Sequence, residues 1–168
     1  AFTLNLTVKW PLSLVLSKEA LTKYQLIFRH LFYCKHVETR ICASWLQQQS
    51  TKGLNLRSLL GRQYALLQRM LHFLQNFEYY VMFEVLEPRW HELEGRMRTV
   101  KTVDELMKHH GEFLDTCLRE CLLTDQKLLK IFAKLMAICL DFAESQETFA
   151  RNMDDAAADI ERTSALSR

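Results

Sequence analysis

The sequence contains few of the residues that interrupt helices. It has only 4 glycines and 2 prolines in 168 residues, whereas 49% of the residues are apolar and 25% are charged. This composition is typical of long helices joined by short connections, and it argues against a β-sandwich, whose many turns require glycine and proline. A domain of this length buries about two-thirds of the surface that its unfolded chain exposes. We therefore predict one helical domain with a substantial core.

The sequence also lacks a strong charge of one sign and a long apolar run. The formal net charge is +2, so no broad field favours nucleic acid or an acidic membrane surface as a partner. The longest apolar candidate, FAKLMAICLDFA, contains Lys134 and Asp141 and falls short of the roughly 18 apolar residues of a membrane span. No secretory signal pattern precedes Lys9. The first residue is alanine, and we expect the sequence to be a fragment of a longer protein.

The five cysteines are an odd number without tight repeated spacings. They indicate reduced, mostly buried thiols in a cytosolic or nuclear compartment rather than disulfides. Cys117 and Cys121 lie one helical turn apart, shortly after His109 and His110, which raises the alternative of a zinc site. The usual spacing of two residues between zinc-binding cysteines is absent, so we expect core packing and no bound metal.

The sequence has no glycine-rich phosphate loop, no GxSxG elbow and no HExxH pair. A di-iron bundle needs glutamate three residues before a histidine, and none of the six histidines has one. An acidic cluster around Pro88 can be interpreted as an acid–base set or as exposed carboxylates near a helix start; it comprises Glu84, Glu87, His91, Glu92 and Glu94. We expect no enzyme activity and no cofactor, and a metal-dependent helical enzyme is the least favoured alternative.

The N-terminal part is predicted to be extended as far as Leu16. Leu4, Leu6 and Val8 alternate with polar residues, which is the pattern of a strand with one buried face. Trp10–Pro11 then leads into a further apolar stretch, and a residue before proline favours extended backbone.

A long first helix is predicted to follow this segment. Ser17 can cap it by accepting a hydrogen bond from a free backbone N–H, and Glu19 lies in the first turn, where the helix dipole favours a negative charge. The helical pattern holds from Lys18 to about Gln49, and Gly53 is the predicted stop.

Three further helices complete the prediction of an all-α, antiparallel bundle of about four long helices with a short extended N-terminal segment. The second begins near Leu54 and kinks or restarts at Pro88. The third opens with a capping box formed by Thr102 and Glu105, and the fourth begins at Thr124 and Asp125 and runs to Met153. The predicted division is an extended segment over residues 1–16, a bundle over 17–155 and a solvated tail over 156–168.

One polar stripe follows the otherwise apolar first helix at helical spacing and contains no acidic residue; it comprises Lys18, Thr22, Gln25, Arg29, Tyr33, His36 and Arg40. Such a stripe can be an ordinary wet face. Because aromatic residues together with arginine are favoured at protein interfaces, we predict that Arg29, Tyr33, His36 and Arg40 contact a partner protein. The stiff, apolar Trp10–Pro11 connector is the second predicted interface element.

The segment KWPLSLVLSKEALTKYQLIFRHLFYCKHVE, residues 9–38, closely resembles the C-terminal half of the gamma-tubulin complex components. The resemblance depends on the joint pattern K-W-P-L-S-L, the serine cap, A-L-x-K-Y and F-R-H-L-F-Y-C-K-H-V-E. It continues through YALLQRMLHFLQNFEYYVMFEVLEPRWHELEGRM and TVDELMKHHGEFLDTCLRECLLTDQKLLK, and so covers roughly residues 4–153.

This resemblance implies a mostly helical, non-enzymatic scaffold that binds gamma-tubulin and other gamma-tubulin complex components. It further implies a role in the ring-like template that nucleates microtubules at centrosomes or spindle poles, within the cytoplasmic cytoskeleton. Nucleic acid and membrane are not implied as partners. The family's large N-terminal half is absent from the sequence, so ring assembly by this chain alone is not expected. The alternative is a structural bundle that mediates only contacts between complex components.

Overall fold

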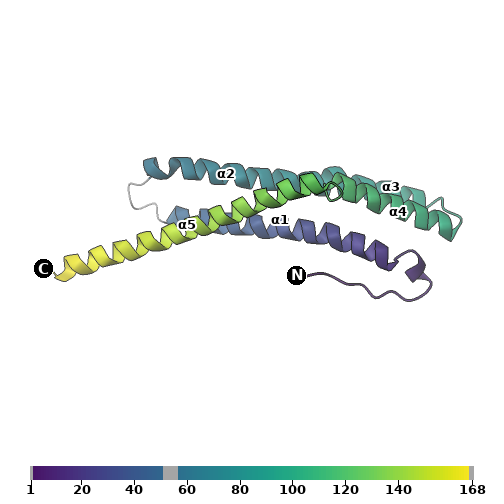
Figure 1. Ribbon diagram of the computed structural model, residues 1–168, viewed down its shortest axis with the longest axis horizontal. Coiled ribbons are helices and arrows are strands. Elements are labelled where there is room, and N and C mark those ends of the chain that lie inside the picture. Colours follow the sequence, from purple (N-terminus) through teal and green to yellow (C-terminus); the bar gives the residue numbers. More distant parts are fainter. Residues whose placement is uncertain (1, 51–56, 167–168) are drawn as a thin grey trace. The chain divides into compact units, whose positions relative to one another are not determined.

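The computed structural model describes residues 2–50 and 57–166, and these residues are almost entirely helical (Figure 1). The elements in chain order are η1 (Leu12–Leu14), α1 (Lys18–Ser50), α2 (Arg57–Tyr79), η2 (Tyr80–Leu86), α3 (Glu87–Met97), α4 (Val103–Glu120) and α5 (Gln126–Leu166). No strand occurs in the part of the chain that the structure describes. The all-α prediction is therefore confirmed. No helix among these residues is long and apolar enough to cross a membrane.

The chain divides into two compact units. The first consists of Ala1–Lys35 and Gln75–Ala133, and the second of His36–Leu74 and Lys134–Arg168. In the first unit, α3 and α4 run antiparallel beside each other, joined by a short turn, and the N-terminal segment runs along the start of α1 (Figure 1).

Two predicted helix caps are confirmed in the first unit. The backbone N–H of Ala20 donates to Ser17 Oγ at 3.2 Å, and that of Glu105 donates to Thr102 Oγ1 at 3.2 Å. Each bond satisfies one of the N–H groups that a helix start leaves without an intrahelical acceptor. The Glu105 carboxylate accepts from the N–H of Lys101 at 3.2 Å, so the capping box closes one residue earlier than its usual form.

The N-terminal segment differs from the prediction beyond Lys9. Residues 2–9 have no regular secondary structure, but Leu12–Leu14 forms a 3₁₀ turn, and the Trp10–Pro11 peptide bond is cis. The N–H of Leu14 donates to the carbonyl of Pro11 at 3.0 Å, and that of Leu16 to the carbonyl of Leu12 at 2.9 Å. The prediction of extended backbone as far as Leu16 was thus wrong. No neighbouring strand is available here among the described residues, so the backbone groups of Leu12–Leu14 and the two residues after it are satisfied locally by turns.

At Pro88, where the sequence predicts a kink or a restart, the backbone remains helical and α3 begins at Glu87. Pro88 lies in the first turn of α3 and has no N–H to donate to the helical turn before it. The seven preceding residues, Tyr80–Leu86, are wound as a π-helix, and the N–H of Glu87 donates to the carbonyl of Met82, five residues back. A proline ring clashes with the carbonyl four residues before it in an α-helix, and the wider winding moves that carbonyl away.

The core of the first unit is built where α1, η2 and α4 meet. One cluster contains Ile27, Cys117 and Leu118, and a second contains Val81, Val85 and Cys121. Three partly buried leucines, Leu31, Leu86 and Leu123, pack against both clusters and make them continuous.

The second unit buries small and medium-sized side chains from α1, α2 and α5; they include Val37, Ile41, Ser44, Leu67, Leu74, Met136, Cys139, Ala143, Gln146 and Ala150.

Asp125 caps α5, because its Oδ1 accepts from the N–H of Lys127 at 2.8 Å. The predicted stop at Gly53 and the predicted start near Leu54 lie outside the described residues. The helix of the predicted fourth element continues past Met153 to Leu166.

Candidate partner-binding surface

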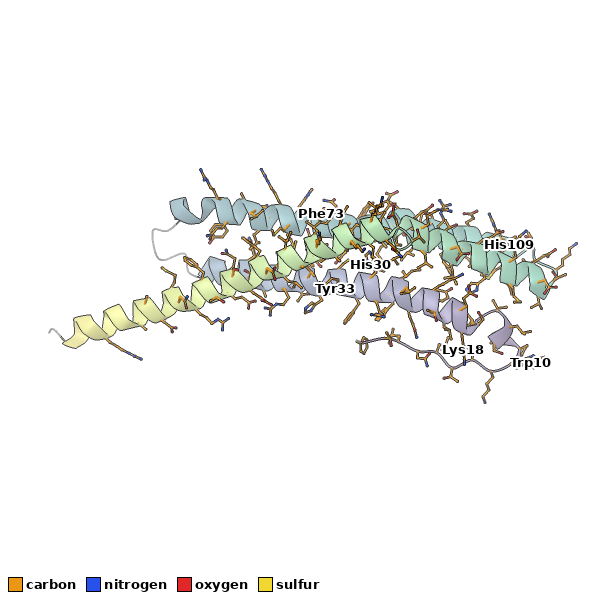
Figure 2. The ribbon with its side chains drawn as sticks, in the orientation of Figure 1. Trp10, Lys18, His30, Tyr33, Phe73 and His109 are labelled. Carbon is orange, nitrogen blue, oxygen red and sulfur yellow. The ribbon has the colours of Figure 1, made fainter. Side chains whose placement is uncertain are left out.

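The predicted interface element Trp10–Pro11 is at the surface of the first unit. The Trp10 side chain is 78% exposed, and Pro11 is also exposed. Trp10 has no hydrogen-bond or ring partner among the described residues. It lies at the bend between the N-terminal segment and α1, well separated along the first unit from Tyr33 (Figure 2). The structure therefore does not bring these two predicted elements into one patch.

Arg29 and Tyr33 lie one turn apart on α1 and are both exposed. Neither side chain has an ion-pair or hydrogen-bond partner within the described part of the chain. Tyr33 is 39% exposed, so about two-fifths of a large amphipathic side chain faces solvent. An arginine and a tyrosine without internal partners can be desolvated by an incoming protein without breaking any contact of their own.

Next to these residues, the N-terminal segment contacts α1 through aromatic rings. The Phe2 ring lies 6.2 Å from that of Phe28 and 5.5 Å from that of Phe32, measured between centroids. Gln25 Nε2 donates to the carbonyl of Leu4 at 2.9 Å. Phe32 is 50% exposed and contacts the N-terminal segment rather than the core of the unit.

The other two predicted residues, His36 and Arg40, belong to the second unit. His36 is exposed. Arg40 Nη2 donates to Glu147 Oε2 at 3.0 Å, with the arginine side chain 37% exposed and the glutamate 21% exposed. The stripe has no acidic member along α1, but α5 supplies one. Arg40 is therefore partly neutralised inside the unit and is a weaker candidate than Arg29.

An apolar groove separates the N-terminal segment from α1 in the first unit. It has a volume of about 550 Å³, and its apolar lining consists of Leu4, Leu6, Leu16, Leu21, Tyr24 and Phe28. We call it the N-terminal groove. A volume of this size is within the range of protein ligand sites. The sequence pattern did not predict it, because alternation along the segment does not tell how far the segment stands from the helix.

Polar contacts position α1 against α4 beside this groove. The Tyr24 hydroxyl and His110 Nε2 are hydrogen-bonded at 2.9 Å, and burial lowers the pKa of His110. Lys23 Nζ lies 2.7 Å from Asp115 and 2.9 Å from Glu19, and the hydrogen bond to Asp115 raises the pKa of Lys23. His110, which the zinc alternative placed near Cys117, is buried.

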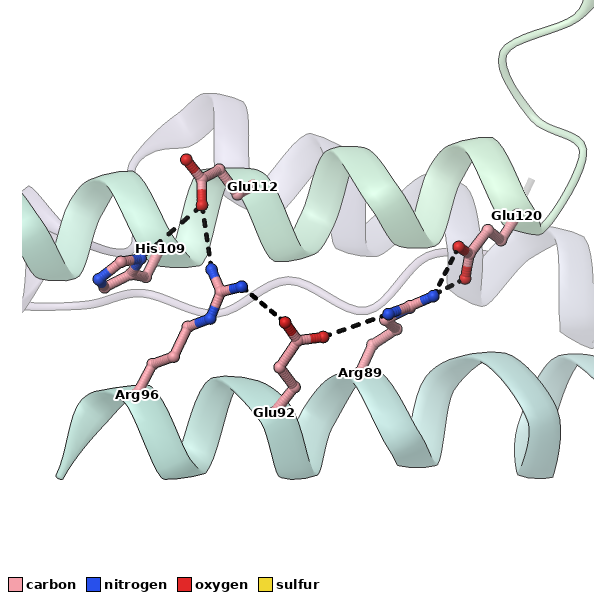
Figure 3. Close-up of polar contacts among 6 residues, drawn as sticks. All are labelled: Arg89, Glu92, Arg96, His109, Glu112 and Glu120. Atoms are coloured by element: carbon pink, nitrogen blue, oxygen red, sulfur yellow. Dashed lines mark hydrogen bonds and ion pairs between the residues drawn. The ribbon is translucent and has the colours of Figure 1, made fainter. Parts of the chain in front are cut away.

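The acidic cluster around Pro88 forms part of an ion-pair ladder between α3 and α4 (Figure 3). Glu120 accepts from Arg89 Nε at 3.1 Å and from Nη2 at 2.9 Å, which is the two-pronged geometry of strong arginine–carboxylate pairs. Glu92 accepts from Arg89 and from Arg96, and Arg96 also donates to Glu112 at 3.1 Å.

These pairs make Glu92 and Glu94 unsuitable as general acids. The hydrogen bond from Arg89 lowers the pKa of Glu92, and the hydrogen bond from Arg98 lowers the pKa of Glu94. A carboxyl that donates a proton near neutral pH needs the opposite shift. The ladder is better explained as the element that fixes α3 on α4.

The cysteines of the first unit lie in its core. Burial raises the pKa of Cys117 to about 11, and that of Cys34 and of Cys121 to about 12. These buried thiols are protonated at neutral pH and are therefore poor nucleophiles. Among the described residues, no three histidine, cysteine or acidic side chains converge as metal ligands do.

The whole sequence, residues 1–168, matches the family model described as Gamma tubulin complex component C-terminal. The chain belongs to this family. It is 46% identical over 155 residues to Gamma-tubulin complex component 2 of Mus musculus, a match that covers 91% of this chain and 17% of the mouse protein. It is 45% identical over 147 residues to Gamma-tubulin complex component 2 of Arabidopsis thaliana, covering 87% of this chain and 22% of the plant protein.

A third relative carries a different name. Spindle pole body component alp4 of Schizosaccharomyces pombe is 40% identical over 153 residues, which is 87% of this chain and 20% of the yeast protein. The chain thus spans about a fifth of the length of these three relatives. The family resemblance predicted from the opening helix is confirmed over the whole sequence.

Proposed function

We propose that this chain is part of a non-enzymatic scaffold that binds gamma-tubulin within a gamma-tubulin complex and supports microtubule nucleation. The observation that carries the proposal is the family match over the entire chain, together with relatives named as gamma-tubulin complex components and a spindle pole body component. The site of action is then the cytoskeleton at a microtubule-organising centre.

The contact with gamma-tubulin is assigned in this proposal to the exposed side of α1 in the first unit. Arg29 and Tyr33 are exposed and have no partner among the described residues. A rigid helix with a free cation beside a large aromatic side chain suits an acidic protein surface, because charge steers the encounter and the aromatic ring supplies buried area. His36 is retained as a further contact from the second unit. Trp10 and Pro11 are retained as a separate contact, and Arg40 is ranked last because Glu147 already pairs with it.

Co-elution of the chain with purified gamma-tubulin in size-exclusion chromatography tests the proposal. The native chain is expected to co-elute. Arg29→Glu and Tyr33→Ala are each expected to weaken binding by about tenfold or more, as residues at the centre of an interface do. The matched control is Lys108→Glu, which reverses an exposed cation on α4 that also has no partner among the described residues.

The results of this experiment distinguish gamma-tubulin binding itself from the assignment of the binding face. No co-elution of the correctly folded native chain would reject gamma-tubulin binding by this chain and would favour contacts between complex components only. Co-elution that Arg29→Glu and Lys108→Glu weaken equally would reject the assigned face and leave gamma-tubulin binding in place. Arg40→Glu should be scored only beside a thermal unfolding curve, since the new carboxylate would face Glu147.

A further inference from the structure

The segment from Phe2 to Lys9 has a backbone that is open for hydrogen bonding. Among the described residues, no backbone N–H from Thr3 to Lys9 has an acceptor. Two of the carbonyls are engaged: that of Leu4 accepts from Gln25, and that of Lys9 accepts from the N–H of Ser13 at 3.3 Å. Figure 1 shows the segment as an outstretched coil. A row of free donors and acceptors is what a strand edge offers to another chain.

The side chains of this segment have the pattern of a strand. Leu4, Leu6 and Val8 alternate with Asn5, Thr7 and Lys9. Such alternation gives a strand one apolar and one polar face. A single strand is not a stable element, since even an isolated two-stranded hairpin is marginal in water. The described part of the chain supplies no second strand, so the pattern is that of a β-ribbon with one member missing.

The N-terminal groove supplies room for the missing member's side chains. Leu4 and Leu6 line it from the segment, and Leu21 and Phe28 line it from α1. Leu4 and Leu6 are still 60% and 54% exposed, so apolar surface remains to be covered. In recognition by strand addition, main-chain hydrogen bonds provide affinity, and pockets for alternate side chains provide specificity. The open edge and the groove together meet both requirements.

The charges around the segment indicate the chemistry of the incoming strand. Residues 1–18 include Lys9 and Lys18 and no acidic residue, and the next residue, Glu19, already pairs with Lys23 at 2.9 Å. Neither lysine has an ion-pair partner among the described residues. A second copy of this chain would bring the same cations to the ribbon, whereas acidic side chains would pair with them.

We propose that residues 4–9 are an open strand that accepts an extended segment of a partner protein. The incoming segment alternates apolar with acidic residues. Its apolar side chains enter the N-terminal groove, and its carboxylates lie near Lys9 and Lys18. This surface is distinct from the Arg29 and Tyr33 face, and the inference does not depend on gamma-tubulin being the partner.

The probe for the test is a short synthetic peptide in which valine and leucine alternate with glutamate. Hydrogen–deuterium exchange of the full chain, followed by mass spectrometry of the fragment that covers residues 2–9, reports the backbone directly. Without peptide, these amides are expected to exchange at the rate of an unstructured chain. Saturating peptide is expected to slow their exchange by about tenfold or more, because strand pairing protects amides.

Matched controls separate strand addition from simple apolar docking. N-methylation of the glutamates removes the backbone N–H donors along one edge of the peptide and keeps every side chain. N-methylation of the valines and leucines removes the N–H donors along the opposite edge. Only one of these two methylated peptides should lose binding. On the chain, the N–H groups of Thr7 and Val8 point to opposite edges, and neither side chain lines the groove. One of Thr7→Pro and Val8→Pro is therefore expected to weaken peptide binding about tenfold, and the other to leave it within about twofold.

Several results would overturn the proposal. Binding that tolerates both N-methylated peptides, or that falls equally with both proline variants, would mean that no strand pairs here. Equal binding of a peptide with lysine in place of glutamate would reject the acidic partner. Amide protection that grows with chain concentration alone would identify a second copy as the occupant. Circular dichroism of each variant verifies that the helices, which the N-terminal segment does not cap, remain folded.

Discussion

Replacing His30 should change how the stability of this chain responds to acid. His30 is 8% exposed, and its ring lies 4.8 Å from that of Phe132 and 5.6 Å from that of Phe77. Its Nε2 has no hydrogen-bond partner among the described residues. Burial among aromatic rings disfavours the imidazolium, so the pKa of His30 is lowered from its ordinary value of 6.5.

The sign and size follow from proton linkage. Between the lowered pKa of the folded state and about 6.5 in the unfolded state, the unfolded chain binds the proton and the folded chain does not. The stabilisation is therefore fully present above about pH 6.5 and is lost as the pH falls through the folded-state pKa. One such group changes the free energy of unfolding by at most about 1.4 kcal/mol per pH unit. His110, whose pKa is also lowered by burial, adds a contribution of the same sign.

Urea denaturation followed by far-ultraviolet circular dichroism, at several values between about pH 7.5 and pH 5, measures this dependence. The lower limit keeps ordinary carboxylates ionised. His30→Leu has a similar volume and should remain within about 1.5 kcal/mol of the native chain at neutral pH. As the pH falls through the lower half of this range, the free energy of unfolding of His30→Leu should decrease by on the order of 1 kcal/mol less than that of the native chain. The control, Leu128→Ala, alters an exposed residue that does not titrate and should leave the slope unchanged. An unaltered slope in His30→Leu would show that His30 is protonated as readily in the folded state as in the unfolded one.

Three further predictions concern the stability of the first unit and the reactivity of Cys42 and Cys117. Thr102→Ala removes the cap of α4 and should lower the free energy of unfolding by about 1 kcal/mol in urea titrations, whereas Thr102→Ser should restore it. Leu114→Ala empties a position that is 1% exposed and should cost about 2–5 kcal/mol by the same measurement; Leu128→Ala, at an exposed position, should cost far less, and equal costs would contradict the described core. Ellman's reagent near pH 8 should modify the half-buried Cys42 before Cys117, whose pKa of about 11 and full burial leave almost no reactive thiolate; early labelling of Cys117 would show that the core opens.

Local signals in the sequence were sufficient to predict the helices and most of their starts. Ser17 and Thr102 are capping residues whose effect extends over a single turn, so their neighbours in sequence contain all the necessary information. The extension to Leu16 was wrong because the apolar residues after Pro11 can satisfy their backbone either by pairing with a strand or by turning, and the sequence does not show which. The π-helical winding before Pro88 was not predicted either, since it depends on relieving a clash along the backbone.

The candidate surface was less predictable, because it depends on tertiary neighbours. The stripe on α1 contains no acid, yet Glu147 lies 107 residues away from Arg40 in sequence and pairs with it. Phe32 follows an apolar line of the helix, but the neighbouring N-terminal segment is what it contacts. In the sequence, the ladder between α3 and α4 could be recognised only as an acidic cluster. Its arginine–glutamate pairs form only when the two helices lie antiparallel beside each other.

The π-helical stretch Tyr80–Leu86 determines how this helix tolerates changes in length. Its bonding to the fifth residue accommodates one residue more than ordinary turns do, as if an insertion had been absorbed without a break. Deleting one residue there would let the backbone close as plain α-helix and would leave the orientation of the later positions nearly unchanged, because the wide turn is what absorbed the extra residue. α3 would then still present the same side to α4, and the Arg89–Glu120 pair would be kept. A deletion in the ordinary turns of α2 has no such reserve and would rotate every later position about the axis.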